Sequence, residues 1–170
     1  MRRKLSEKSE VNRIHNEEAE TMLVTGLIED QSRLKEIKLG LSDMAYAGCE
    51  VIAVYNAARL LGKEYKLSEL ICNAERSGAL MRNGKWGTNP FSLDRLCPDE
   101  EIIFKRIKEL PTESGIYILS FWNSQGLFGG VHTVCMRIGN GEIKLYNYNG
   151  TMEMLQKNKP IITISEIMKE

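Results

Sequence analysis

The chain has 170 residues, 42% of them hydrophobic and 27% charged, and its 23 basic and 23 acidic side chains give a formal net charge of zero. This size and composition predict one globular domain with a sizeable core. The charge balance argues against a general nucleic-acid-binding protein, and no apolar run is long enough to span a membrane. Because the basic N-terminus is not followed by an apolar segment, it does not look like a secretory signal, and we expect a cytoplasmic protein.

Residues 1–40 are rich in charge and predict one or two amphipathic helices. We expect this segment to be a charged helical N-terminal extension, packed on a main domain of residues 41–170 through the apolar stretch Met22–Ile28. His15 lies in a polar part of the segment, which is typical of an exposed surface histidine.

Residues Met44–Gly62 predict a short loop that leads into a helix. Apolar residues recur at helical spacing from Val51 onward, and Gly62 stands where a C-terminal cap belongs. This places Cys49 in the first turn of the helix. Unpaired backbone N–H groups and the helix dipole favour a thiolate there, which makes Cys49 a candidate nucleophile.

The middle of the chain predicts short elements joined by turns. Ser68 is a candidate N-cap for a helix that ends near Gly78, and Pro90 is suited to the first turn of a short helix. The stretch from Ile102 predicts either a strand or the start of a helix that reaches Leu110.

The second half predicts β-structure. Four strands are expected, at residues 115–122, 131–138, 142–148 and 160–164, and Asn140–Gly141 is a strong signal for a two-residue hairpin turn. Helices followed by antiparallel strands predict an α+β fold in which the Cys49 helix packs on the sheet.

The four cysteines, Cys49, Cys72, Cys97 and Cys135, show no zinc-ligand spacing and are too sparse for a disulfide framework. We therefore expect reduced thiols, no metal and no cofactor. Histidines are scarce too. Besides His15 the chain has only His132, which lies on a predicted strand and is the candidate general base for Cys49.

A nucleophile–base pair needs a third group to orient the imidazole, and two asparagines follow on the next predicted strand. A Gly139–Asn140 turn would place Asn147 opposite His132, whereas an Asn140–Gly141 turn would place Asn149 there. Turn statistics favour the second register. Because Asn149 is itself followed by glycine in a turn-forming pair, we favour Asn147 as the third residue.

A cysteine at a helix start, then a histidine and a polar residue on successive strands, resembles the papain-like cysteine peptidases. The compact spacing is most similar to the double-glycine-leader, or bacteriocin-processing, peptidases and related bacterial proteins. The resemblance is carried by Met44–Gly62, the Gly87–Pro90 loop, and the stretch from Gly130 to Asn147. It implies a papain-like fold and hydrolysis of a peptide or amide bond. Cys49 would be the nucleophile, His132 the base and Asn147 the orienting residue.

Two features depart from that family's pattern. Papain-like enzymes place a glutamine before the cysteine as an oxyanion donor, whereas this chain has no glutamine between Gln31 and Cys49, and the nearest candidate is Asp43. In addition, Glu50 directly follows the cysteine, and a carboxylate there opposes a thiolate. Two alternatives therefore stand beside the peptidase: a catalytically inactive papain-like domain that binds a peptide or protein partner, and a related amidase or deamidase.

Overall fold

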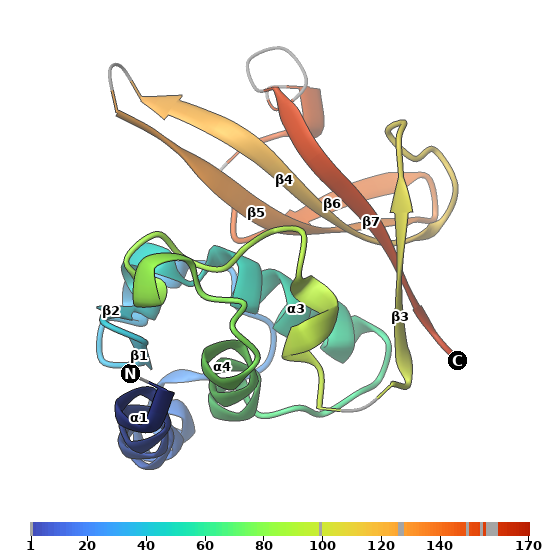
Figure 1. The fold of residues 1–170 in the computed structure, drawn as a ribbon. Coiled ribbons are helices and arrows are strands. Elements are labelled where there is room, and N and C mark those ends of the chain that lie inside the picture. The colour runs from blue at the N-terminus through green and yellow to red at the C-terminus, as the bar shows by residue number, and fades with distance from the viewer. Residues whose placement is uncertain (1, 99, 126–127, 149, 154, 156–159) are drawn as a thin grey trace.

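The computed structural model describes residues 2–98, 100–125, 128–148, 150–153, 155 and 160–170. Helices gather on one side of a five-stranded antiparallel sheet (Figure 1), which confirms the predicted α+β class. The helical elements are α1 (Arg2–Leu23), η1 (Gln31–Arg33), α2 (Met44–Ala47), α3 (Cys49–Leu60), α4 (Leu67–Arg76), η2 (Met81–Gly84) and η3 (Leu93–Leu96).

The main sheet has the strand order β3-β7-β4-β5-β6. Its strands are β3 (Ile102–Ile107), β4 (Gly115–Gln125), β5 (Phe128–Gly139), β6 (Glu142–Tyr146) and β7 (Ile161–Lys169), and a separate pair is formed by β1 (Lys38–Leu39) and β2 (Ser42–Asp43). The β5–β6 turn has positive φ at Asn140 and Gly141, 54° and 77°. This is the left-handed geometry of a two-residue hairpin, as predicted.

The stretch from Ile102 is a strand, which confirms the first of its two predicted alternatives. The last two strands end at other residues than expected. Strand β6 ends at Tyr146, so Asn147 has left the sheet. Strand β7 runs on to Lys169, because its second half pairs with β3, with Ile102 opposite Lys169.

Both faces of the sheet carry buried apolar residues. One face packs against α3, and its residues include Ile118, Cys135 and Ile167, which belong to the same apolar cluster as the core of α3. The opposite face carries a smaller cluster that includes Phe121 and Val134. Helix α4 lies beyond α3, and α1 lies beyond α4 (Figure 1), so α3 is the long helix that packs directly on the sheet.

Helix α1 docks differently from the prediction. Met22 is 77% exposed and Leu23 is also exposed, so the expected apolar face is wrong at these two residues. Beyond the helix, Ile28 is buried and Val24 and Leu27 pack against the main apolar cluster, as expected. The buried side of α1 instead carries Asn12, Asn16 and Ala19. The side-chain amide of Asn16 accepts a hydrogen bond from the backbone N–H of Lys38 at 2.7 Å and donates one to the Lys38 carbonyl at 2.8 Å. Hydrogen bonds of this kind therefore help to hold α1 on the rest of the protein.

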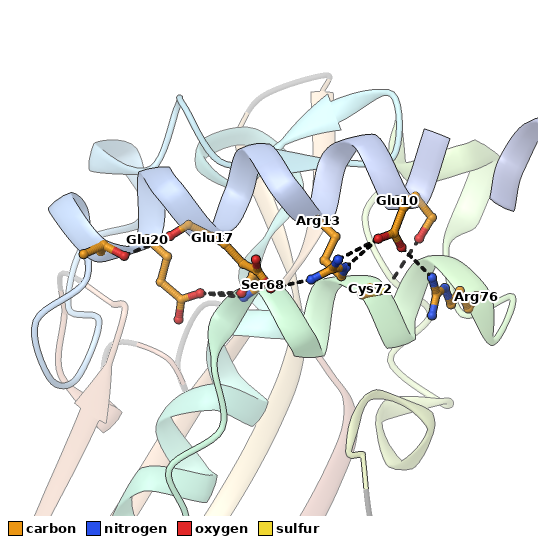
Figure 2. Close-up of polar contacts among 9 residues, drawn as sticks. Glu10, Arg13, Glu17, Glu20, Ser68, Cys72 and Arg76 are labelled. Carbon is orange, nitrogen blue, oxygen red and sulfur yellow. Dashed lines mark hydrogen bonds and ion pairs between the residues drawn. The ribbon is translucent and has the colours of Figure 1, made fainter. Parts of the chain in front are cut away.

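Polar contacts also join α1 to α4, as Figure 2 shows. Helix α4 begins at Leu67, so Ser68 is its second residue, and the side chain of the N-cap residue, Lys66, makes no capping hydrogen bond. The carboxylate of Glu20 on α1 caps the helix instead, accepting from the backbone N–H groups of Leu67 and Ser68 and from the Ser68 hydroxyl. A long-range contact has therefore replaced the local N-cap that Ser68 was predicted to provide.

Candidate functional site

Cys49 is the first residue of α3, as predicted, and follows α2 after a single residue, Gly48. A Cβ atom at Gly48 would lie 2.6 Å from the carbonyl oxygen of Met44, so only glycine fits this tight junction. Asp43 is the N-cap of α2, and its carboxylate accepts from the backbone N–H of Tyr46 at 3.0 Å. Asp43 therefore serves as a helix cap.

The Cys49 thiol is almost completely buried, with 6% of the residue exposed. It donates to Glu50 Oε2 at 3.3 Å and lies 3.9 Å from the carbonyl oxygen of Val131. Burial and the negative charge of Glu50 raise the pKa of this thiol well above its ordinary value. The helix start alone was expected to favour a thiolate, and here these two effects outweigh it.

The carboxyl of Glu50 faces the sheet from α3. It accepts from Thr133 Oγ1 at 3.4 Å and from the backbone N–H of Thr88 at 3.5 Å, and Thr133 Oγ1 is in turn 2.9 Å from Ser120 Oγ. Only 2% of Glu50 is exposed. Burial raises its pKa to about 7, against the opposing effect of the hydrogen bonds that favour the charged form.

A cavity of about 500 Å³ opens at the start of α3, between the helical side and the ends of β4 and β5. We call it the Cys49 cavity. Its lining includes Cys49, Glu50, Gly87 and Lys85 and three aromatic side chains, Tyr46, Trp86 and Trp122. These aromatic residues are 75%, 63% and 43% exposed. Large exposed aromatic side chains gathered at one cavity are typical of a binding site.

His132 lies on the other face of the sheet. Side chains alternate along β5, and Thr133 points toward Glu50 and α3, so His132 points away from them. Its ring packs edge to face on Phe121 at a centroid distance of 5.6 Å, and its Nε2 is 2.9 Å from the backbone oxygen of Asn147. The predicted pairing of His132 with Cys49 is therefore not formed.

The Asn147 side chain also has a different partner from the one expected. Its Oδ1 accepts from the backbone N–H of Gln31 at 3.0 Å, and its Nδ2 donates to Gln31 Oε1 at 2.8 Å. The structure thus brings the backbone of Asn147 to His132, but it assembles no Cys49–His132–Asn147 triad. Asn149, the alternative third residue, lies outside the described residues. A catalytic role for Cys49, His132 and Asn147 stays a prediction that no contact between the thiol and the other two supports.

Sequence reasoning missed the pairing of Glu50 with Thr133 and the place of Tyr46 and Trp122 in the cavity lining. A signal for the first was present, since Glu50 is an acidic residue directly before the apolar run Val51–Val54. His15 is exposed, as expected, with its Nε2 2.8 Å from the backbone oxygen of Glu36.

Among the described residues, no cluster of three or more histidine, cysteine or acidic side chains could hold a metal ion. In the same part of the chain, every helix is too short or too polar to cross a bilayer. Comparisons with known proteins gave no matching family model, no matching curated protein and no matching solved structure.

Proposed function

We propose that this protein is a papain-like domain that binds a peptide segment in the Cys49 cavity and lacks a Cys–His catalytic pair. The support for the papain-like part is the resemblance in sequence, together with a cysteine-bearing helix start packed across an antiparallel sheet. In that family the substrate peptide lies beside the cysteine. The aromatic lining at the same place here is suited to holding a peptide.

The observation that carries the proposal is the position of His132 on the face of the sheet opposite Cys49. A general base must come within about 3 Å of the proton that it removes, directly or through one water. With the imidazole behind the sheet and the thiol neutral and buried, binding is better supported than Cys–His hydrolysis.

A peptide-binding measurement tests this. The chain has two tryptophans, Trp86 and Trp122, and both line the cavity, so intrinsic tryptophan fluorescence reports directly on its occupancy. We expect pools of acetylated, amidated peptides to change this fluorescence in a saturable way. Tyr46→Ala should weaken binding, whereas Phe91→Ala should not, because Phe91 is an exposed aromatic residue that does not line the cavity. Absence of binding by every pool would overturn the proposal.

A cysteine hydrolase, acting as a peptidase or an amidase, is the second candidate, and the contact between Cys49 and Glu50 favours it. Glu50 could take the thiol proton as Cys49 Sγ attacks a carbonyl carbon, and return it to the leaving amine; water would then release the acyl group as a carboxylic acid. Mass spectrometry of the same peptide pools discriminates the two candidates. Cleavage by the native protein that is lost in Cys49→Ala would replace the binding proposal with this one.

A further inference from the structure

Glu50 is a buried carboxyl in the wall of the Cys49 cavity. Its hydrogen bonds come from a thiol, a hydroxyl and a backbone N–H, all of them neutral donors. Among the described residues, no lysine, arginine or histidine nitrogen lies within 4.0 Å of it. A buried carboxylate without a cationic partner is costly in free energy, and a cation supplied by a ligand would remove that cost.

Gly87 lies directly against this carboxyl. A Cβ atom at that position would lie 3.1 Å from both Glu50 Oε2 and the Ala47 carbonyl oxygen, closer than an ordinary contact, so a larger residue would crowd the carboxyl. Gly87 has a φ of +74°, a conformation that glycine adopts without strain. Both residues line the Cys49 cavity, so a ligand group can reach the carboxyl through it.

The aromatic residues that line the cavity are also suited to binding a cation. Tyr46, Trp86 and Trp122 present aromatic rings, and aromatic faces attract ammonium and guanidinium groups. Arg82 already lies 4.2 Å above the ring of Trp86, and Lys85 is part of the lining. Both cationic residues are exposed, so water and salt screen them, whereas the field of the buried Glu50 is screened much less.

We propose that the peptide bound in the Cys49 cavity presents a lysine or arginine side chain whose cationic group pairs with Glu50 between the aromatic side chains. This inference rests on the proposed function and names the chemistry of its ligand. Charge complementarity selects the cationic side chain, and the length of a lysine or arginine stem suits a carboxyl that lies at the inner end of an aromatic-lined opening.

The test uses host peptides that differ at one position: acetylated, amidated Ala-Ala-X-Ala-Ala with X as lysine, arginine, norleucine or glutamate. Norleucine matches the lysine stem without its charge. Tryptophan fluorescence titrations should show the lysine and arginine peptides binding about tenfold more tightly than the norleucine peptide, the usual effect of one buried charged hydrogen bond. Glu50→Gln should abolish that preference, whereas Glu64→Gln, an exposed residue outside the cavity lining, should retain it.

The pH dependence of the native protein provides a second test that needs no variant. Only the ionised carboxyl pairs with a cation, so the affinity for the lysine peptide should rise about fivefold from pH 6 to pH 8, as a group with a pKa of about 7 becomes ionised. The norleucine peptide should show no such rise. Lysine itself keeps its charge throughout this range.

The possible results distinguish recognition of a cationic side chain from peptide binding itself. If the peptides bind with no preference for lysine or arginine, the inference fails and the binding function stands. If no peptide binds, both fail. If n-butylammonium displaces the lysine peptide at concentrations equal to that peptide's own dissociation constant, the cavity recognises a free amine and the peptide part of the inference is overturned.

Discussion

The thiol of Cys49 donates a hydrogen bond of 3.3 Å to the carboxyl of its neighbour in sequence, Glu50. Consecutive residues on a helix usually point in different directions, but both of these side chains turn into the same cavity at the first turn of α3. The carboxylate stabilises the protonated thiol and so opposes the effect of the helix start. The reactivity of Cys49 therefore depends on its burial and on Glu50, and not only on its position in the helix.

Alkylation by iodoacetamide at pH 7.5 tests this dependence. We expect native Cys49 to react more slowly than the half-buried Cys97, because its thiol is buried and its pKa is raised. Glu50→Gln removes a negative charge, which should lower the pKa of the Cys49 thiol and raise its labelling rate by about tenfold for each unit of that fall. Peptide mapping by mass spectrometry measures both sites in one sample, with Cys97 as internal reference.

His132→Ala provides the matching negative result. Because the imidazole lies on the opposite face of the sheet, its removal should leave the labelling rate of Cys49 unchanged. A slower rate in this variant would mean that His132 acts on the thiol, and it would restore the predicted Cys–His pair.

Glu50 also predicts a pH dependence of stability. A folded-state pKa of about 7, raised from 4.5, means that the folded protein holds this proton more tightly than the unfolded chain does. Stability from this group is therefore complete below about pH 4.5 and is lost as the pH rises through 7, by about 3 kcal/mol in total. The free energy of unfolding of the native protein should fall by that amount relative to Glu50→Gln between pH 4 and pH 8. Urea unfolding measures this, and Glu64→Gln should track the native protein throughout.

The elements that the sequence predicted well are those with strong local signals. The start of the helix at Cys49 follows from its apolar periodicity and from the glycine before it, and the hairpin at Asn140–Gly141 follows from turn chemistry. Both depend on contacts between residues that are near in sequence.

The orientation of His132 could not be read in the same way. Along β5, Thr133 and Cys135 are buried against α3, while Val134 and Met136 are buried on the other face. Alternation of apolar and polar residues identifies the inner face only when one face is solvated, and here both are covered. The partner of Asn147 was equally hidden, since Gln31 is 116 residues away in the sequence.

The contact between α1 and α4 provides a prediction about the N-terminal segment. Glu20→Ala leaves two backbone N–H groups at the start of α4 without their acceptor, so the free energy of unfolding should fall by about 1–3 kcal/mol. Glu17→Ala, on the same helix, is the matched control (Figure 2). Its ion pair with Arg13 is exposed to solvent and should contribute far less. Equal losses in the two variants would contradict the capping role of Glu20.

Asn147 has a left-handed backbone with a φ of 62° and makes two hydrogen bonds to Gln31. Asn147→Ala should lower the free energy of unfolding by about 2–4 kcal/mol, because it loses both bonds and strains the backbone. Asn147→Gly tolerates that conformation and should lose only the part due to the bonds, about 1–2 kcal/mol.

A double-mutant cycle of Asn147→Gly with Gln31→Ala then isolates the contact between the two amides, with an expected coupling of about 1 kcal/mol. The same variants are informative about the proposed function. If Asn147 joins the N-terminal segment to the end of β6, its loss should reduce stability while leaving the labelling rate of Cys49 unchanged. A residue that positions a catalytic imidazole would show the reverse, with a small change in stability and a large change in the reactivity of the thiol.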